Sequence, residues 1–162
     1  MTIAARAKRR AILIFSLNRS GVLNKISMLI RRKMYNVETI TACTTLQPSI
    51  SRITLTLRED SDQNMRQVVK QIEKMTEVIS ARELDVDQSF WREVAIVKFQ
   101  ADDSNLELLK DKHSFEILDC QEFDVYAVQI AGTSQMIDAF LQAIGERRVL
   151  EVARSGYTAL EK

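Results

Sequence analysis

The stretch Asn18-Arg19-Ser20-Gly21-Val22-Leu23 decides how the first part of this chain folds. It is short, polar and contains a glycine, and it separates an apolar strand-like segment (11–17) from an amphipathic helix-like segment. A turn of this kind leaves free backbone N–H groups at the start of a helix, where the helix dipole also favours anions. Tyr35-Asn36-Val37-Glu38 follows one helix length later and opens the next strand. Together the two stretches predict a small-molecule carboxylate site at a sheet edge.

The apolar pattern around this turn predicts six regular elements. They are a strand at 11–17, a helix at 22–33, strands at 36–46 and 51–58, a helix at 61–74 and a strand at 77–84. In the strand at 51–58, Ile53, Leu55 and Leu57 alternate with Arg52, Thr54 and Thr56, which indicates one apolar and one polar face. The order β-α-β-β-α-β is that of ferredoxin-like domains.

The same order of elements repeats in the second half of the chain. We expect strands at 91–101, 115–120, 124–131 and 150–154, and helices at 105–112 and 134–145. The sequence therefore predicts an α+β protein of two ferredoxin-like βαββαβ domains, 11–84 and 91–162, each an antiparallel sheet with helices on one face. A polar, acidic linker (85–90) joins them, and a flexible tail (1–10) precedes the first. Domains of this size have small cores and open sheet edges, so we expect them to pack on a partner.

Composition narrows the possible functions. The 162 residues include 23 Lys and Arg and 22 Asp and Glu, so the net charge of +1 provides no general attraction to nucleic acid. The apolar runs are too short for a membrane helix. Cys43, Cys120 and the single His113 do not have the spacing of a zinc site. We expect two reduced thiols in a cytoplasmic protein.

No motif of a catalytic site, nucleotide loop or metalloprotease occurs in the sequence. Two other functions of ferredoxin-like folds remain open. One is acyl-phosphate hydrolysis, which would pair Arg19 with Asn36. The other is RNA binding, which needs exposed aromatic residues on the central strands. The turn itself also has a purely structural interpretation, with Ser20 as the N-cap of the helix and Gly21 providing backbone freedom.

Several short motifs occur in the chain in the same order as in a known protein family. Besides the two stretches above, they are Ser51-Arg52-Ile53-Thr54, Arg92-Glu93-Val94-Ala95-Ile96-Val97-Lys98, Val128-Gln129-Ile130-Ala131-Gly132 and Glu151-Val152-Ala153-Arg154-Ser155-Gly156. From about residue 10 to 160 the chain resembles the small, regulatory subunits of acetolactate synthase (acetohydroxyacid synthase). The resemblance implies that the first domain is an ACT domain, which is an amino-acid sensor, and that the second is a smaller domain of similar order.

The resemblance also implies a role and a site. The protein would have no catalysis and no cofactor of its own, because thiamine diphosphate, Mg and FAD would belong to the large catalytic subunit. It would bind and activate that subunit and confer feedback inhibition by valine, without contacting nucleic acid or membrane. ACT domains would pair as a homodimer, with one chain facing the effector through Asn18, Ser20, Gly21, Val22 and Leu23. The partner chain would contribute Asn36 and Val37.

The sequence departs from the family pattern at two points near this site. Arg19 stands where an acidic residue is common, and Met34 stands where a glycine usually precedes Tyr35-Asn36. These changes leave open whether valine, leucine or isoleucine is the preferred effector. An alternative is a stand-alone ACT-type sensor that regulates another partner.

Overall fold

The computed structural model describes residues 9–85 and 87–162. They form two compact units, of which the second comprises residues 91–158 and the first includes both the chain up to Phe90 and the last four residues, 159–162. Most of the expected tail (1–10) lies outside the described residues, and the first strand already begins at Arg9.

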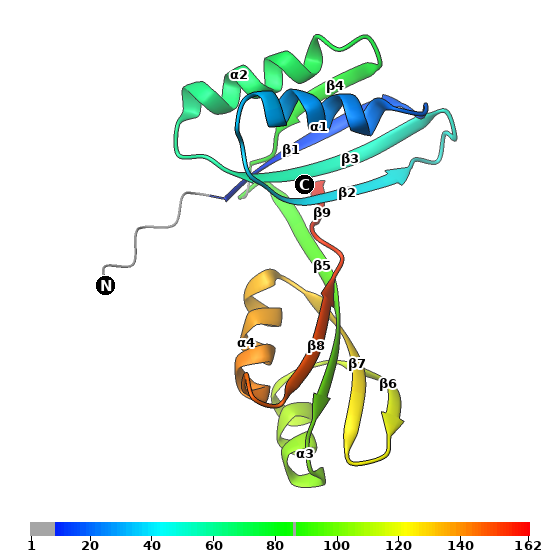
Figure 1. The fold of residues 1–162 in the computed structure, drawn as a ribbon, viewed down its shortest axis with the longest axis vertical. Coiled ribbons are helices and arrows are strands. Elements are labelled where there is room, and N and C mark those ends of the chain that lie inside the picture. Colours follow the sequence, from blue (N-terminus) through cyan, green and yellow to red (C-terminus); the bar gives the residue numbers. More distant parts are fainter. Residues whose placement is uncertain (1–8, 86) are drawn as a thin grey trace. The chain divides into compact units, whose positions relative to one another are not determined.

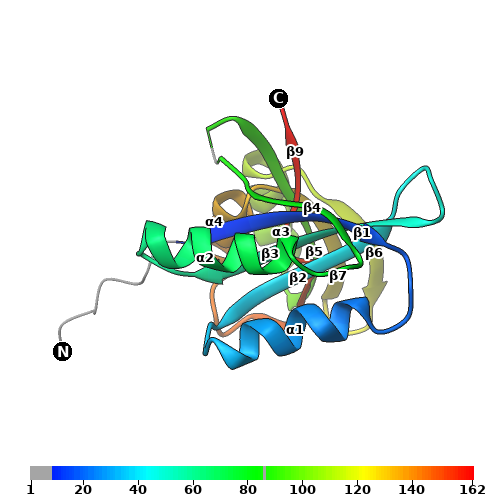
Figure 2. The same cartoon turned by 90° about the horizontal axis from the view of Figure 1, so that it is seen from above.

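The first unit has the expected β-α-β-β-α-β order. Its elements are β1 (Arg9–Leu17), α1 (Val22–Arg32), β2 (Val37–Thr44), β3 (Ile50–Arg58), α2 (Asp62–Glu73) and β4 (Val78–Glu83). The strands form an antiparallel sheet of order β2-β3-β1-β4. Figures 1 and 2 show α1 and α2 side by side on one face of this sheet. Ile12 and Leu55 from the sheet and Ile26 and Ile72 from the helices are fully buried between the layers.

A buried arginine fixes the start of β1 beneath the helix layer. Only 7% of the Arg10 side chain is exposed, and its guanidinium binds both carboxylate oxygens of Glu83 on β4 at 2.5 and 2.7 Å. The same group binds Asp62 at the start of α2 at 2.7 Å. These charged hydrogen bonds satisfy a cation that would be costly to bury alone.

The second unit repeats the order. Its elements are β5 (Ser89–Gln100), α3 (Asp103–Lys112), β6 (Glu116–Gln121), β7 (Val125–Gly132), α4 (Ser134–Ile144) and β8 (Val149–Arg154), with the strands in the order β6-β7-β5-β8. α3 and α4 lie on one face of the sheet (Figure 1). β5 begins at Ser89, so Ser89 and Phe90 belong to this strand and not to the linker (85–90) that we expected.

One strand was not expected from the sequence. β9 (Thr158–Glu161) pairs with β5, and its last residues belong to the first unit. Arg52 donates a hydrogen bond to the carbonyl of Ala159, and Arg82 forms an ion pair with Glu161. By register both arginines lie on the helix-free face of the first sheet, so the C-terminus lies against that face.

The alternation expected for β3 is present, but the threonines on its polar face are buried. Thr54 and Thr56 are 3% and 0% exposed, and Leu13, which pairs with Thr54, is equally buried. The Thr56 hydroxyl is hydrogen-bonded to Thr39 on β2, which makes its burial tolerable. Part of the helix-free face of the first sheet is therefore buried.

Candidate effector site

The turn between β1 and α1 has the backbone geometry that the sequence predicted. Gly21 is the N-cap of α1 and has φ 86°, in the left-handed region that glycine adopts without strain. Ser20 is therefore not the N-cap, and none of the described side chains caps this helix. Among the described residues, a Cβ placed at Gly21 would meet no atom within 4 Å, so the space beside Gly21 is open.

The N–H groups of this turn point to an anion site. Val22 N–H lies 3.4 Å from the carbonyl of Arg19, which is a weak interaction. Within the described part of the chain, the N–H groups of Ser20, Gly21 and Leu23 have no backbone partner. Three donors at the positive end of a helix dipole therefore remain for a ligand or water.

The side chains at the turn have different surroundings. Val22 is 4% exposed and packs in the core, so it can offer a ligand only its backbone. Leu23 is 43% exposed and presents its side chain beside the turn. Asn18 donates from its side-chain amide to the carbonyl of Pro48 at 2.9 Å, and its backbone N–H binds Ser49 at 2.7 Å. Asn18 thus fixes the turn to the β2–β3 loop.

Two charged residues that the sequence reasoning missed complete the surroundings of the turn. Lys25 on α1 forms an ion pair with Glu77, and the backbone carbonyl of Glu77 accepts from Leu17 N–H at 2.8 Å. The hydrogen bond from Lys25, with the backbone N–H of Glu77 and the nearby charge of Arg19, holds the pKa of Glu77 below its ordinary value. The pair ties the start of β4 to α1, and only the fold brings positions 25 and 77 together.

Asn36 and Val37 lie at the other end of the sheet. Val37 pairs with Leu57, which pairs with Arg10 at the start of β1, whereas the turn follows Leu17 at the end of that strand. Seven residues of extended chain separate these levels by about 23 Å. One chain therefore does not bring Asn36 to its own turn. The same separation keeps Arg19 from Asn36, which removes the basis for the acyl-phosphatase interpretation.

Other classes of site find little support in the structure. Across residues 9–85 and 87–162, no group of three or more His, Cys, Asp or Glu side chains could hold a metal ion. No helix in that part is long and apolar enough to cross a membrane. His113 ends α3 and packs edge-on against Phe140.

A β-α-β-β-α-β unit with a glycine turn before its first helix, followed by a second unit of the same order, fits the class of proteins with an N-terminal ACT domain. Within this class, the chain belongs to the family of acetolactate synthase small subunits. Residues 12–80 match the family described as "AHAS small subunit-like ACT domain", and residues 92–162 match "Small subunit of acetolactate synthase".

Individual relatives agree with this assignment along the whole chain. The acetolactate synthase isozyme 3 small subunit of Salmonella typhimurium is 35% identical over 95% of this chain and 96% of its own length. The Bacillus subtilis small subunit is 29% identical over 95% and 91%. The crystal structure of the small subunit from Thermotoga maritima has a TM-score of 0.86 at 24% identity, covering 96% of this chain and 98% of its own. That structural match supports the fold.

Proposed function

We propose that this chain is a regulatory subunit without catalysis or a cofactor of its own. It binds the large, thiamine-diphosphate-dependent catalytic subunit of acetolactate synthase, raises its activity and makes it sensitive to feedback by valine. Thiamine diphosphate, Mg and FAD would be held by the catalytic subunit. Family membership supports the partner, and the geometry of the β1–α1 turn supports an amino-acid effector.

The observation that carries the effector site is the set of free N–H groups at Ser20, Gly21 and Leu23 in front of an open space. A carboxylate accepts several such hydrogen bonds, and the helix dipole adds to its stabilisation. Arg19 places a further positive charge at the rim. The side chain of the effector would then lie beside Leu23, an apolar contact suited to a branched aliphatic group.

The position of Asn36 supports a site shared between two copies. β2 is an edge strand, and its end at Thr44 is level, through Ser51, with Ser16 next to the turn. If two copies pair antiparallel through β2, the start of one β2 lies beside the end of the other. Asn36 and Val37 of one chain then reach the end of the sheet that holds the turn of its partner. Such pairing would also cover an exposed strand edge.

An assay of acetolactate formation tests the proposal. The catalytic subunit is measured alone and with this chain, across a range of valine, leucine and isoleucine concentrations. We expect activation by the chain and inhibition that needs the chain to be present. No activation, together with no co-purification, would contradict the proposed function.

Two variants of one residue locate the effector. Gly21→Asp introduces a carboxylate where the effector carboxylate would bind, so we expect feedback to be lost while activation is retained. Gly21→Asn is the matched control, because asparagine has the same size and tolerates a left-handed backbone but carries no charge. It should weaken inhibition much less. Normal inhibition of the Gly21→Asp holoenzyme would show that the effector binds elsewhere.

A further inference from the structure

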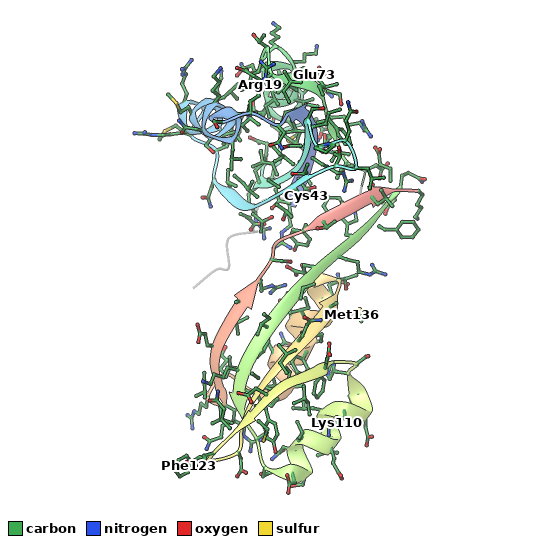
Figure 3. All side chains as sticks on the ribbon, turned by 90° about the vertical axis from the view of Figure 1, so that its right-hand side faces the viewer. Arg19, Cys43, Glu73, Lys110, Phe123 and Met136 are labelled. Carbon is green, nitrogen blue, oxygen red and sulfur yellow. The ribbon has the colours of Figure 1, made fainter. Side chains whose placement is uncertain are left out.

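The turn between β6 and β7 carries a large aromatic residue at its tip. Phe123 is 82% exposed, and Figure 3 shows its side chain directed away from the ribbon. A single exposed apolar residue is common and needs no explanation by itself. Phe123 differs from an ordinary exposed residue in its backbone conformation, in the hydrogen bonds that hold its turn and in the charge of its hairpin.

The backbone at this tip is unfavourable for phenylalanine. Phe123 and Asp124 have φ 64° and 57°, so two successive residues of this turn have a left-handed backbone. Glycine and asparagine adopt such a backbone most readily, and a bulky residue with positive φ is rare. Phenylalanine at this position gains nothing from burial and adds strain, so the stability of this unit does not account for it.

The strained tip is nevertheless held firmly. The side-chain amide of Gln100, at the end of β5, donates to the carbonyl of Phe123 at 3.0 Å. The backbone N–H of Ala101 donates to the carbonyl of Asp124, also at 3.0 Å. The last residue of a central strand and the residue after it thus hold both left-handed residues. An aromatic side chain presented from a fixed backbone loses little entropy on binding, as is typical of interface anchors.

The hairpin that carries Phe123 is acidic in sequence. From residue 114 to residue 145 the chain has no Lys, Arg or His. The hairpin itself contributes four exposed carboxylates, which are those of Glu116, Asp119, Glu122 and Asp124. An apolar anchor on an acidic hairpin fits a partner pocket that has an apolar floor and a basic rim.

We infer that the β6–β7 tip docks on the catalytic subunit, with Phe123 in an apolar pocket rimmed by Lys or Arg. The inference rests on the proposed function, and it names the docking surface that the family assignment leaves open. A symmetric contact between two such tips is disfavoured, because it would bring like charges together. The β2 edge proposed for pairing lies in the other unit and shares no residue with the tip.

Phe123→Asn separates binding from folding. Asparagine suits the left-handed turn, so the melting temperature of the variant should equal or exceed that of the wild type. Loss of a central aromatic anchor should raise the concentration of this chain needed for half-maximal activation of the catalytic subunit about 30-fold. Leu108→Asn is the matched control, because Leu108 is a 56% exposed residue on α3 of the same unit. It should leave that concentration unchanged.

The outcomes are distinguishable. If the wild-type chain fails to activate the catalytic subunit, that result contradicts both the proposed function and this inference. If the wild type activates and Phe123→Asn activates at the same concentration, only the docking inference is overturned. The inference is also overturned if Phe123→Asn changes only the self-association of the chain, seen by sedimentation, because the tip then contacts a second copy.

A charge reversal tests the basic rim. Glu122→Lys should weaken activation most at low ionic strength, where electrostatic attraction is least screened. Glu107→Lys, the same change on α3, should have little effect. Equal or tighter binding of Glu122→Lys would contradict a basic rim and overturn the inference.

Discussion

The residues that flank α1, Gly21 and Met34, share a left-handed backbone with φ 86° and 61°. Gly21 adopts it without strain, and Met34, which follows the C-cap residue Lys33, does not. The Met34 side chain is 90% exposed, so no burial offsets this cost. The glycine that relatives of this family are expected to have here would suit the backbone better. Within one chain Met34 extends into solvent.

Met34→Gly should therefore raise the free energy of unfolding by about 1 kcal/mol, since glycine relieves the left-handed strain. Met28→Gly is the matched control, because Met28 lies within α1 and is 54% exposed. There the same substitution should lower the free energy of unfolding by about 1 kcal/mol. Urea denaturation measures both. A loss of stability in Met34→Gly would show that the methionine makes a stabilising contact.

Glu38 links stability to pH. Burial alone would raise its pKa, but hydrogen bonds from Arg58 at 2.6 Å and Arg9 at 2.5 Å outweigh burial and hold the pKa below its ordinary value of 4.5. A lowered folded-state pKa means that the ionised form stabilises the fold. This contribution is complete above the unfolded pKa and is lost as pH falls through the folded one.

Glu38→Gln should thus lower the free energy of unfolding at pH 7 by about 1–2 kcal/mol. The difference from the wild type should shrink as the pH falls below about 4.5, where the unfolded-state carboxyl protonates. Denaturation curves at several pH values measure this, with Glu107→Gln on the surface of α3 as the control. A difference that does not vary with pH would contradict the account.

At the level of elements, the helices and the strands of both sheets were predictable and β9 was not. The alternation of Ile53, Leu55 and Leu57 indicated the correct apolar face of β3. It did not indicate that Thr54 and Thr56 would also be buried, because alternation shows which residues share a face and not what covers that face. β9 has four residues, too few for a periodic pattern, and a glycine at 156 precedes it as in any loop.

The alternation within β9 gives a sharp test of its packing. Ala159 is 0% exposed, whereas its neighbour Leu160 is 62% exposed. Ala159→Gln would force a large amide into a buried position and should cost about 1–3 kcal/mol. Leu160→Gln should change stability by less than about 0.5 kcal/mol. Equal effects in urea denaturation would show that β9 does not pack on the first sheet in solution.

At the candidate site, some features could be predicted from the sequence and others only from the structure. The glycine turn could be predicted from Gly21 and the helix pattern after it. The inward direction of Val22 followed from the same pattern. The anchoring of Asn18 to Pro48 could not be predicted, because it depends on the length and path of the β2–β3 loop. The ion pair of Lys25 with Glu77 joins two elements and leaves no local signal.

At the scale of the whole molecule, the central claim is that an effector site is built from two chains. The separation of about 23 Å between the levels of Asn36 and of the turn prevents one chain from supplying both parts. Two chains paired antiparallel through β2 would bring the turn of one chain to Asn36 of the other twice, once at each end of the joined sheet. An effector that binds between chains acts through any difference in affinity between the assembly's states.

Mixing two inactive variants tests this claim most directly. Gly21→Asp and Asn36→Ala should each fail to bind valine as a homodimer, by calorimetry. A mixed dimer has one site with both defects and one site with neither. After the two variants are unfolded and refolded together, we predict restored binding, at about one valine for every four chains. If the refolded mixture binds no more valine than the separate variants, the site is not shared between chains and the account is wrong.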